Sequence, residues 1–185
     1  MMDDKKVRVI KAAREVFLKY GYVKATMNDL AKAAGISRPA LYLVFAGKEE
    51  IFSEVVKYLT IELSNTVKEE SQKLNDPMNK LLKVFDVWVF RIYELLSQSE
   101  EAKDLYQSSL PFAQECIRDS SKMFESDILN ALLQFPAGRL NPNITPQEMA
   151  CVFAEAIPGF KQNSDNAEEI RDKIDLLIKM SILNE

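Results

Sequence analysis

Apolar residues recur at helical spacing through most of the chain, and short polar or proline-containing segments separate the helices that this pattern predicts. Thr145 and Glu148 form a capping box with a proline at the first helical position, and Pro158 is expected to end or kink the helix that begins there. The pattern predicts an all-α protein without a convincing strand. From residue 48 onward the expected helices cover about 48–73, 78–97, 100–107, 111–135, 146–157 and 167–183.

Two short helices that meet at a tight turn are predicted between residues 26 and 45. Thr26 and Asp29 form a variant capping box that opens the first helix. Gly35 has the conformational freedom that a sharp turn requires, and Ser37 can cap a second helix that has Pro39 in its first turn. Two helices joined this way expose the second one, as in a helix-turn-helix, and this arrangement predicts DNA binding.

The second helix, about residues 38–45, has two faces. Leu41, Val44 and Phe45 share the side expected to pack inward, while Pro39 and Leu43 share the side expected to face a partner. The alternative is a tight helical corner inside a bundle, whose aromatic residues are ordinary surface groups.

Positive charge flanks this helix. Arg38 begins it, and Lys48 lies where the following helix opens, so helix-start amides and a lysine are available to hold a phosphate. Leu43 is suited to touch a thymine methyl group, which is an apolar form of base recognition.

With the helix that precedes it, this segment resembles the N-terminal domain of the TetR/AcrR family of transcriptional regulators. The resemblance extends from Val9 to Phe52, VIKAAREVFLKYGYVKATMNDLAKAAGISRPALYLVFAGKEEIF, and its most specific part is the run from Leu41 to Glu49. It implies an N-terminal three-helix domain over residues 1–50. A C-terminal helical bundle for ligand binding and dimerisation would follow over residues 51–185.

The resemblance also implies which residues meet DNA. Leu43 and Val44 depart from the family, which usually has large polar or aromatic side chains there, and Gly47 replaces a stronger helix cap. Phosphate contacts are implied for Thr26, Ser37, Tyr42 and Lys48, and contacts with base edges or the sugar backbone for Arg38, Pro39 and Ala40.

Charge is unevenly divided along the 185 residues. Residues 1–50 hold ten Lys and Arg against six Asp and Glu, a balance of +4, so the total of −4 leaves −8 for residues 51–185. The basic part is the one expected to bind DNA.

Several function classes lack support in the sequence. The chain has no histidine, no Cys-x-x-Cys, no nucleophile motif and no glycine-rich phosphate loop, so we expect neither an enzyme nor a metal or other cofactor. The start MMDDKK is not a signal peptide, and no apolar run is long enough to span a membrane, so a cytoplasmic protein is expected. Cys116 and Cys151 are interpreted as reduced buried thiols, with a redox-sensing pair as the alternative.

Aromatic and other large residues of the C-terminal part are candidates for lining a ligand pocket, although each also fits an ordinary core position. The acidic balance of the region, with Asp86 and Glu115 near aromatic positions, suits a cationic ligand. The candidates are Phe85, Trp88, Tyr93, Tyr106, Phe112, Cys116, Met123, Phe124 and Phe153.

The last helix has one narrow apolar stripe, which suits docking onto another helix. The family resemblance implies a homodimer through the last two helices, while the pattern alone equally allows docking onto the chain's own core. The function expected is that of a repressor that binds a pseudo-palindromic double-stranded DNA operator as a dimer and is released by a small-molecule inducer. The alternative is a helical small-molecule sensor or carrier with weak or vestigial DNA binding.

Overall fold

The computed structural model of the protein describes residues 4–97, 101 and 111–183, with side chains for all of these except 111–114. Its elements are helical, apart from one isolated β-bridge between Leu140 and Ile182, so the predicted all-α class is confirmed. The chain forms two compact units, one from Met1–Glu62 with Glu94–Ser120 and the other from Leu63–Tyr93 with Ser121–Glu185. These units follow packing, and the predicted functional division at residue 50 stays a prediction.

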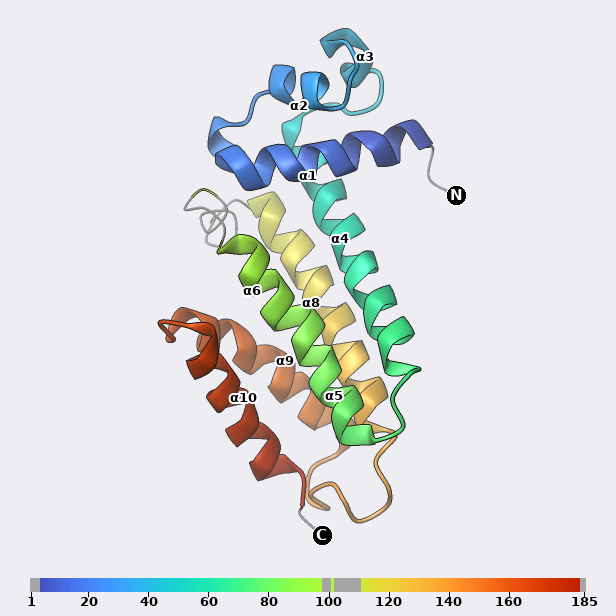
Figure 1. Cartoon of the computed structure of the whole chain (residues 1–185), viewed down its shortest axis with the longest axis vertical. Helices are drawn as coiled ribbons and strands as arrows, with labels where there is room; N and C mark the ends of the chain where they lie inside the picture. Colours follow the sequence, from blue (N-terminus) through green and yellow to red (C-terminus); the bar gives the residue numbers. More distant parts are fainter. Residues whose placement is uncertain (1–3, 98–100, 102–110, 184–185) are drawn as a thin grey trace. The chain divides into compact units, whose positions relative to one another are not determined.

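The first unit is built from α1 (Asp4–Lys24), α2 (Met27–Ala33), α3 (Arg38–Tyr42) and the beginning of α4 (Lys48–Ser71). Figure 1 shows α2 and α3 on one side of α1. Apolar side chains from all four helices form one core, because each helix has a buried apolar stripe. This core contains Val9, Ile10, Ala13, Val16, Phe17, Ala25, Leu30, Ala31, Ala34, Leu41, Phe45, Ile51, Phe52 and Val55.

Gly21 interrupts α1 near its end. Its φ of 71° and ψ of 166° are not helical, and they lie where a side chain would be strained. A Cβ atom there would also lie 3.3 Å from the backbone oxygen of Glu101. The last residues of α1 therefore turn away from the helix axis that the first residues define.

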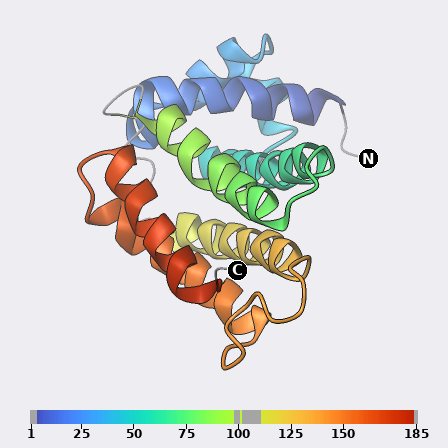
Figure 2. The same ribbon diagram turned by 60° about the horizontal axis from the view of Figure 1, so that its bottom comes forward.

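The second unit contains the end of α4, α5 (Pro77–Phe85), the π-helical segment η1 (Asp86–Phe90), most of α8 (Pro111–Leu132), α9 (Pro146–Gln162) and α10 (Ala167–Ser181). α6 (Arg91–Leu96) begins in this unit. Figures 1 and 2 both show α9 and α10 side by side. The core of this unit is centred on η1, where the four residues from Val87 to Phe90 are all buried.

The π-helical segment was not predicted, because the pattern over 78–97 indicated a single α-helix. The prediction that this helix lies in the middle of a bundle is confirmed by the burial of Leu81, Val84 and Phe85 together with the residues of η1. The run from Val87 to Phe90 presents an apolar side chain at every position, whereas an α-helix with one partner needs only a stripe. A π-helical turn is uncommon and often marks a functional position in a helix.

Other helix boundaries differ from the predictions by a few residues. α9 does not end at Pro158 but continues to Gln162, and both the backbone and the side-chain nitrogen of Asn163 donate to the Gly159 carbonyl at its end. α4 ends at Ser71, α8 at Leu132 and α10 at Ser181, each two or three residues before the predicted end. The helix predicted over 100–107 lies almost entirely outside the described residues.

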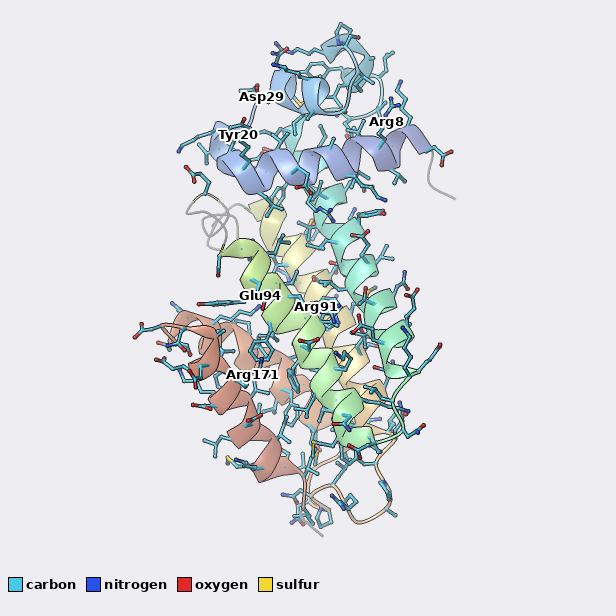
Figure 3. All side chains as sticks on the ribbon, viewed as in Figure 1. Arg8, Tyr20, Asp29, Arg91, Glu94 and Arg171 are labelled. Carbon is cyan, nitrogen blue, oxygen red and sulfur yellow. The ribbon has the colours of Figure 1, made fainter. Side chains whose placement is uncertain are left out.

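Four charged side chains join the end of α4 to α5, η1 and α6. The Arg91 guanidinium donates to both carboxylate oxygens of Glu70, at 2.9 and 2.7 Å, and Figure 3 labels Arg91 on the side of α6 that faces α4. Asp86 accepts from Arg91 at 3.1 Å and from Lys83 at 3.0 Å. Lys83 also pairs with Glu70. We call Glu70, Lys83, Asp86 and Arg91 the charge network.

Candidate nucleic-acid interface

The turn between α2 and α3 has the geometry that the sequence predicted. The Thr26 hydroxyl accepts from the Asp29 amide, and the Asp29 carboxylate accepts from the Thr26 amide and hydroxyl, which completes the capping box. Figure 3 labels Asp29 at the beginning of α2. Gly35 has a φ of 66°, and the Ser37 hydroxyl accepts from the Ala40 amide at the start of α3.

The two faces of the second helix are confirmed. Leu41 and Phe45 are buried in the core of the first unit, and Val44 packs against that core. Leu43, in contrast, is 86% exposed and Tyr42 is 46% exposed. The regular part of α3 is shorter than predicted, because it ends at Tyr42 and Leu43 is its C-cap.

The predicted contact residues of α3 therefore lie on one exposed end of the first unit. Ser37, Arg38 and Pro39 are exposed, and Ala40 is half-buried. Because α3 packs through Leu41, its opposite face is available to a groove of DNA. Thr26 is exposed at the start of α2, where its hydroxyl is already engaged by Asp29. The individual DNA contacts stay predictions.

Arg38 is held over Tyr42. The guanidinium carbon lies 5.7 Å from the centre of the Tyr42 ring, and Nη2 lies 3.5 Å from the phenolic oxygen. The two residues are four positions apart, which places them on the same side of a helix. A cation above an aromatic face is attracted to it, so Tyr42 restricts where the Arg38 guanidinium points.

Lys48 faces inward more than the sequence suggested. Its ammonium donates to the carbonyl oxygens of Tyr22, Val23 and Ala25. Burial lowers the pKa of Lys48 from its ordinary value. The phosphate contact predicted for Lys48 stays a prediction, in competition with these three bonds.

A second candidate site lies in the core of the second unit. The rings of Phe85, Trp88, Phe124 and Phe153 form one cluster, with ring centres 5.5 to 6.1 Å apart in the contacting pairs. These four predicted pocket residues are brought together from α5, η1, α8 and α9. Such a cluster also serves as ordinary core, and whether it opens for a ligand stays a prediction.

A buried carboxylate lies next to this cluster, and the sequence pattern did not predict it. Asp127 of α8 accepts from the indole N–H of Trp88 at 3.0 Å and from the hydroxyl of Ser64 at 3.1 Å, and all three side chains are buried. Burial raises the pKa of Asp127, although both hydrogen bonds act in the opposite direction. A signal was present, since an acidic residue at 127 occupies the same helical stripe as Phe124 and Ile128.

The other predicted pocket residues are not all in this cluster. Tyr93 and Met123 pack against the core of the second unit, and Cys116 is buried within the first. Tyr106 and the Phe112 side chain lie outside the described residues.

The remaining predictions about acids and thiols have mixed outcomes. Asp86, suggested as a partner of a cationic ligand, belongs to the charge network, and Glu115 is exposed. Both cysteines are free thiols, Cys116 buried and Cys151 half-buried.

Among the described residues, no group of three or more Cys, Asp or Glu side chains is placed to hold a metal ion. No helix in the described ranges is both long and apolar enough to cross a membrane.

Comparison with known families identifies the N-terminal part. Residues 9–55 match the model of the bacterial regulatory proteins of the tetR family. The match covers most of α1, all of α2 and α3, and the first residues of α4, which are the helices that form the core of the first unit.

Similarity to individual regulators extends further along the chain. The HTH-type transcriptional regulator YhgD of Bacillus subtilis is 26% identical over 133 residues, which are 70% of this chain and 66% of YhgD, just under two thirds of its length. The negative transcriptional regulator IcaR of the Staphylococcus aureus biofilm operon icaADBC is 28% identical over 147 residues, 70% of this chain and 79% of IcaR.

Similarity in structure covers nearly the whole chain. SmeT, the repressor of the Stenotrophomonas maltophilia multidrug efflux pump SmeDEF, superimposes with a TM-score of 0.69 over 97% of this chain and 91% of SmeT. The two sequences are 17% identical, so this likeness shows the shared fold alone. A complex of SmeT with triclosan gives a TM-score of 0.68 at 15% identity, over 98% of this chain and 93% of that one.

Proposed function

This chain belongs to the TetR family of bacterial regulatory proteins, and we propose that it is a repressor that binds a pseudo-palindromic DNA operator as a homodimer and is released by a small-molecule inducer. The observation that carries the proposal is the exposed face of α3, where Leu43 and Tyr42 face outward while Leu41 anchors the helix in the core. Repression is suggested by the relatives IcaR and SmeT, whose names describe a negative regulator and a repressor. Such a regulator acts in the cytoplasm, where the operator lies.

Residues 1–50 form the proposed DNA-binding domain. In it, Arg38, Pro39 and Ala40 at the start of α3 meet base edges or the sugar backbone, and Leu43 meets a thymine methyl group. Thr26, Ser37 and Tyr42 contact phosphates. The excess of positive charge in this domain supports DNA binding that does not depend on the base sequence. Lys48 adds charge to the same region.

The proposed homodimer uses the last two helices, α9 and α10. Each presents apolar side chains that the described part of its own chain does not bury: Val152 on α9, and Leu176 and Met180 on α10, which are 59% and 69% exposed. Leu176 and Met180 are four residues apart and share one face of α10, away from the face that Ile174 and Ile178 bury. Apolar faces of this kind mark interfaces between copies of a chain.

Residues 51–185 form the proposed ligand-binding and dimerisation domain, and the aromatic cluster at η1 is the candidate inducer site. Large apolar side chains around one buried carboxylate are the composition of a small-molecule site, in which a few polar groups fix the orientation of the ligand. An inducer binds the released conformation more tightly than the DNA-binding conformation. The difference between these two binding free energies is the most by which the inducer can weaken DNA binding. In the alternative function, a helical sensor or carrier, the same site works while the DNA motif is vestigial.

A gel-shift assay with the DNA upstream of the protein's own coding region tests the proposal. We expect a complex that depends on a palindrome and weakens steeply with salt, because phosphate contacts release counterions. A selection from genomic fragments extends the search beyond that region. If the selection recovers no fragment that the protein binds, even at low salt, the proposal is refuted. Tight binding of a small molecule by the same preparation would then support the sensor.

A further inference from the structure

The ammonium group of Lys48 uses all of its hydrogen-bond donors inside the protein. Nζ lies 2.7 Å from the Tyr22 oxygen, 2.9 Å from the Ala25 oxygen and 3.3 Å from the Val23 oxygen. The same atom lies 4.3 Å from the centre of the Tyr22 ring. An ammonium group has three N–H donors and no acceptor, so these three carbonyls use its full donor capacity.

The three acceptors are concentrated where α1 ends. Carbonyl groups in the last turn of a helix lack partners within the helix and form its negative pole, which attracts a cation. Gly21 turns the chain at this point, and the carbonyls that follow it converge on one side chain. Lys48 is the first residue of α4, where a cation is otherwise disfavoured by the positive pole of that helix, so the carbonyls of α1 compensate for its position.

The contact joins the segment before α2 to the first residue of α4, and α2 and α3 lie between these two points in the sequence. Hydrogen bonds at the turn between α2 and α3 fix the first end of α3, including Ile36 N–H to the Ala31 oxygen. The other end leads through residues 43–47 directly to Lys48. α3 itself is only five residues long, which is too short for a helix to be stable without its surroundings.

We infer that Lys48 is a positioning residue, which fixes the beginning of α4 to the end of α1 and thereby sets the placement of α3, and that its ammonium does not contact a DNA phosphate. A phosphate contact would require Nζ to give up at least one of the carbonyl bonds. The inference rests on the proposed DNA binding only for its affinity measurements, because the placement of α3 is also observable without DNA.

Lys48→Met removes the ammonium and keeps most of the stem, and Lys57→Met is the matched control. Lys57 lies on the same helix, and among the described residues it forms an ion pair with Glu54 at the exposed surface. Backbone amide NMR spectra of the DNA-free proteins come first. We expect Lys48→Met to shift the amide resonances of residues 22–25 and of 38–42, and Lys57→Met to leave both groups in place.

DNA affinity is then measured over a range of salt concentrations at a temperature where all variants are folded. We expect Lys48→Met to lower the DNA affinity about tenfold, because the charged hydrogen bonds that hold the beginning of α4 at the end of α1 are lost. The slope of log affinity against log salt should stay unchanged. Loss of a phosphate contact would instead reduce that slope by about one and leave the DNA-free spectra of 38–42 unaltered, which would overturn the inference.

Two further outcomes are decisive. If Lys48→Met only lowers the melting temperature, without changing the α3 resonances or the affinity, Lys48 is merely stabilising and the inference is wrong. Lys48→Arg keeps the charge in case the methionine variant does not fold. A phosphate accepts a guanidinium readily, whereas three convergent carbonyls around one nitrogen do not fit its planar fork. Full affinity in Lys48→Arg would therefore overturn the inference, and lost affinity with an unchanged salt slope would support it.

The test also separates this inference from the proposed function. If the unaltered protein binds no DNA, the proposed function fails. The amide spectra of Lys48→Met and Lys57→Met then still show whether Lys48 positions α3.

Discussion

Trp88 donates its indole N–H to the carboxylate of Asp127, with 3.0 Å between Nε1 and Oδ2, and both side chains are buried. Ser64 donates to the other carboxylate oxygen, so residues from α4, η1 and α8 meet at one polar point in an apolar core. Buried polar groups are costly without partners, and this arrangement supplies partners for all three. The only tryptophan of the chain therefore reports on the centre of the candidate inducer site.

The Asp127 carboxylate is the hydrogen-bond acceptor for both Trp88 and Ser64. Asp127→Ala leaves the Trp88 N–H and the Ser64 hydroxyl without this partner, and we expect it to lower the free energy of unfolding by about 2 to 4 kcal/mol. Asp127→Asn keeps an acceptor oxygen and removes the buried charge, so it should change stability by less than about 1 kcal/mol. Urea unfolding followed by Trp88 fluorescence measures both, and equal losses in the two variants would contradict the assignment.

The contribution of Asp127 to stability should depend on pH. Burial raises the pKa of Asp127 above its ordinary value of 3.8, so between 3.8 and the raised value the folded state holds more protons than the unfolded state. The contribution of Asp127 to stability is therefore complete below 3.8 and is lost as pH rises through the folded pKa. Trp88 fluorescence should show a transition above pH 3.8 that Asp127→Asn lacks. A transition of the same midpoint in both proteins would mean that another group titrates.

The charge network gives a pH dependence of the opposite sign. The Arg91 guanidinium, which donates to both Glu70 oxygens, lowers the pKa of Glu70 to about 2 from its ordinary 4.5. Its stabilisation is present above pH 4.5 and is lost as pH falls toward 2. Because these side chains are partly exposed, we expect Glu70→Gln to cost only about 1 kcal/mol at neutral pH. Denaturant unfolding at a series of pH values from 7 down to 2 measures this cost. A difference from the unaltered protein that does not shrink as the pH falls would contradict the assignment.

The proposed homodimer is tested at the exposed apolar side chains of α10. Met180→Glu places a charge on the outer face of α10, and we expect it to weaken self-association about a hundredfold, because an unpaired carboxylate would have to be buried. Leu133→Glu is the control, since Leu133 is 58% exposed at the end of α8, outside the proposed interface. Sedimentation velocity over a concentration series measures both. Equal association of the two variants would place the interface elsewhere.

Arg38 and Tyr42 should act as a coupled pair in DNA binding. Since the Tyr42 ring orients the Arg38 guanidinium, the double variant Arg38→Ala with Tyr42→Ala should lose less affinity than the sum of the single variants, by about 0.5 to 1 kcal/mol. Arg38 with Thr26 is the control pair, whose effects should add because the two residues begin different helices. Fluorescence anisotropy with labelled operator DNA measures the cycle. Additive losses for Arg38 and Tyr42 would show that the ring does not orient the arginine when DNA is bound.

The features that could be predicted from the sequence are local in the chain. The capping boxes at Thr26 and Thr145, the turn at Gly35 and the inward position of Leu41 depend on residues three or four positions apart and on the conformational freedom of glycine. For this reason the all-α class and the two faces of the second short helix were predicted correctly. The exposed face of α3 follows directly from the spacing of its apolar residues.

Contacts between residues far apart in the sequence could not be predicted, because they depend on how the helices pack. Lys48 was predicted at a phosphate because it opens a helix, but its carbonyl partners lie 23 to 26 positions earlier, and only the packing of α4 against α1 brings them within reach. Asp127 likewise depends on Trp88 and Ser64, which are 39 and 63 positions away. A hydrogen bond between distant residues exists only where helix packing brings donor and acceptor to about 3 Å, and no periodicity in the sequence records that distance.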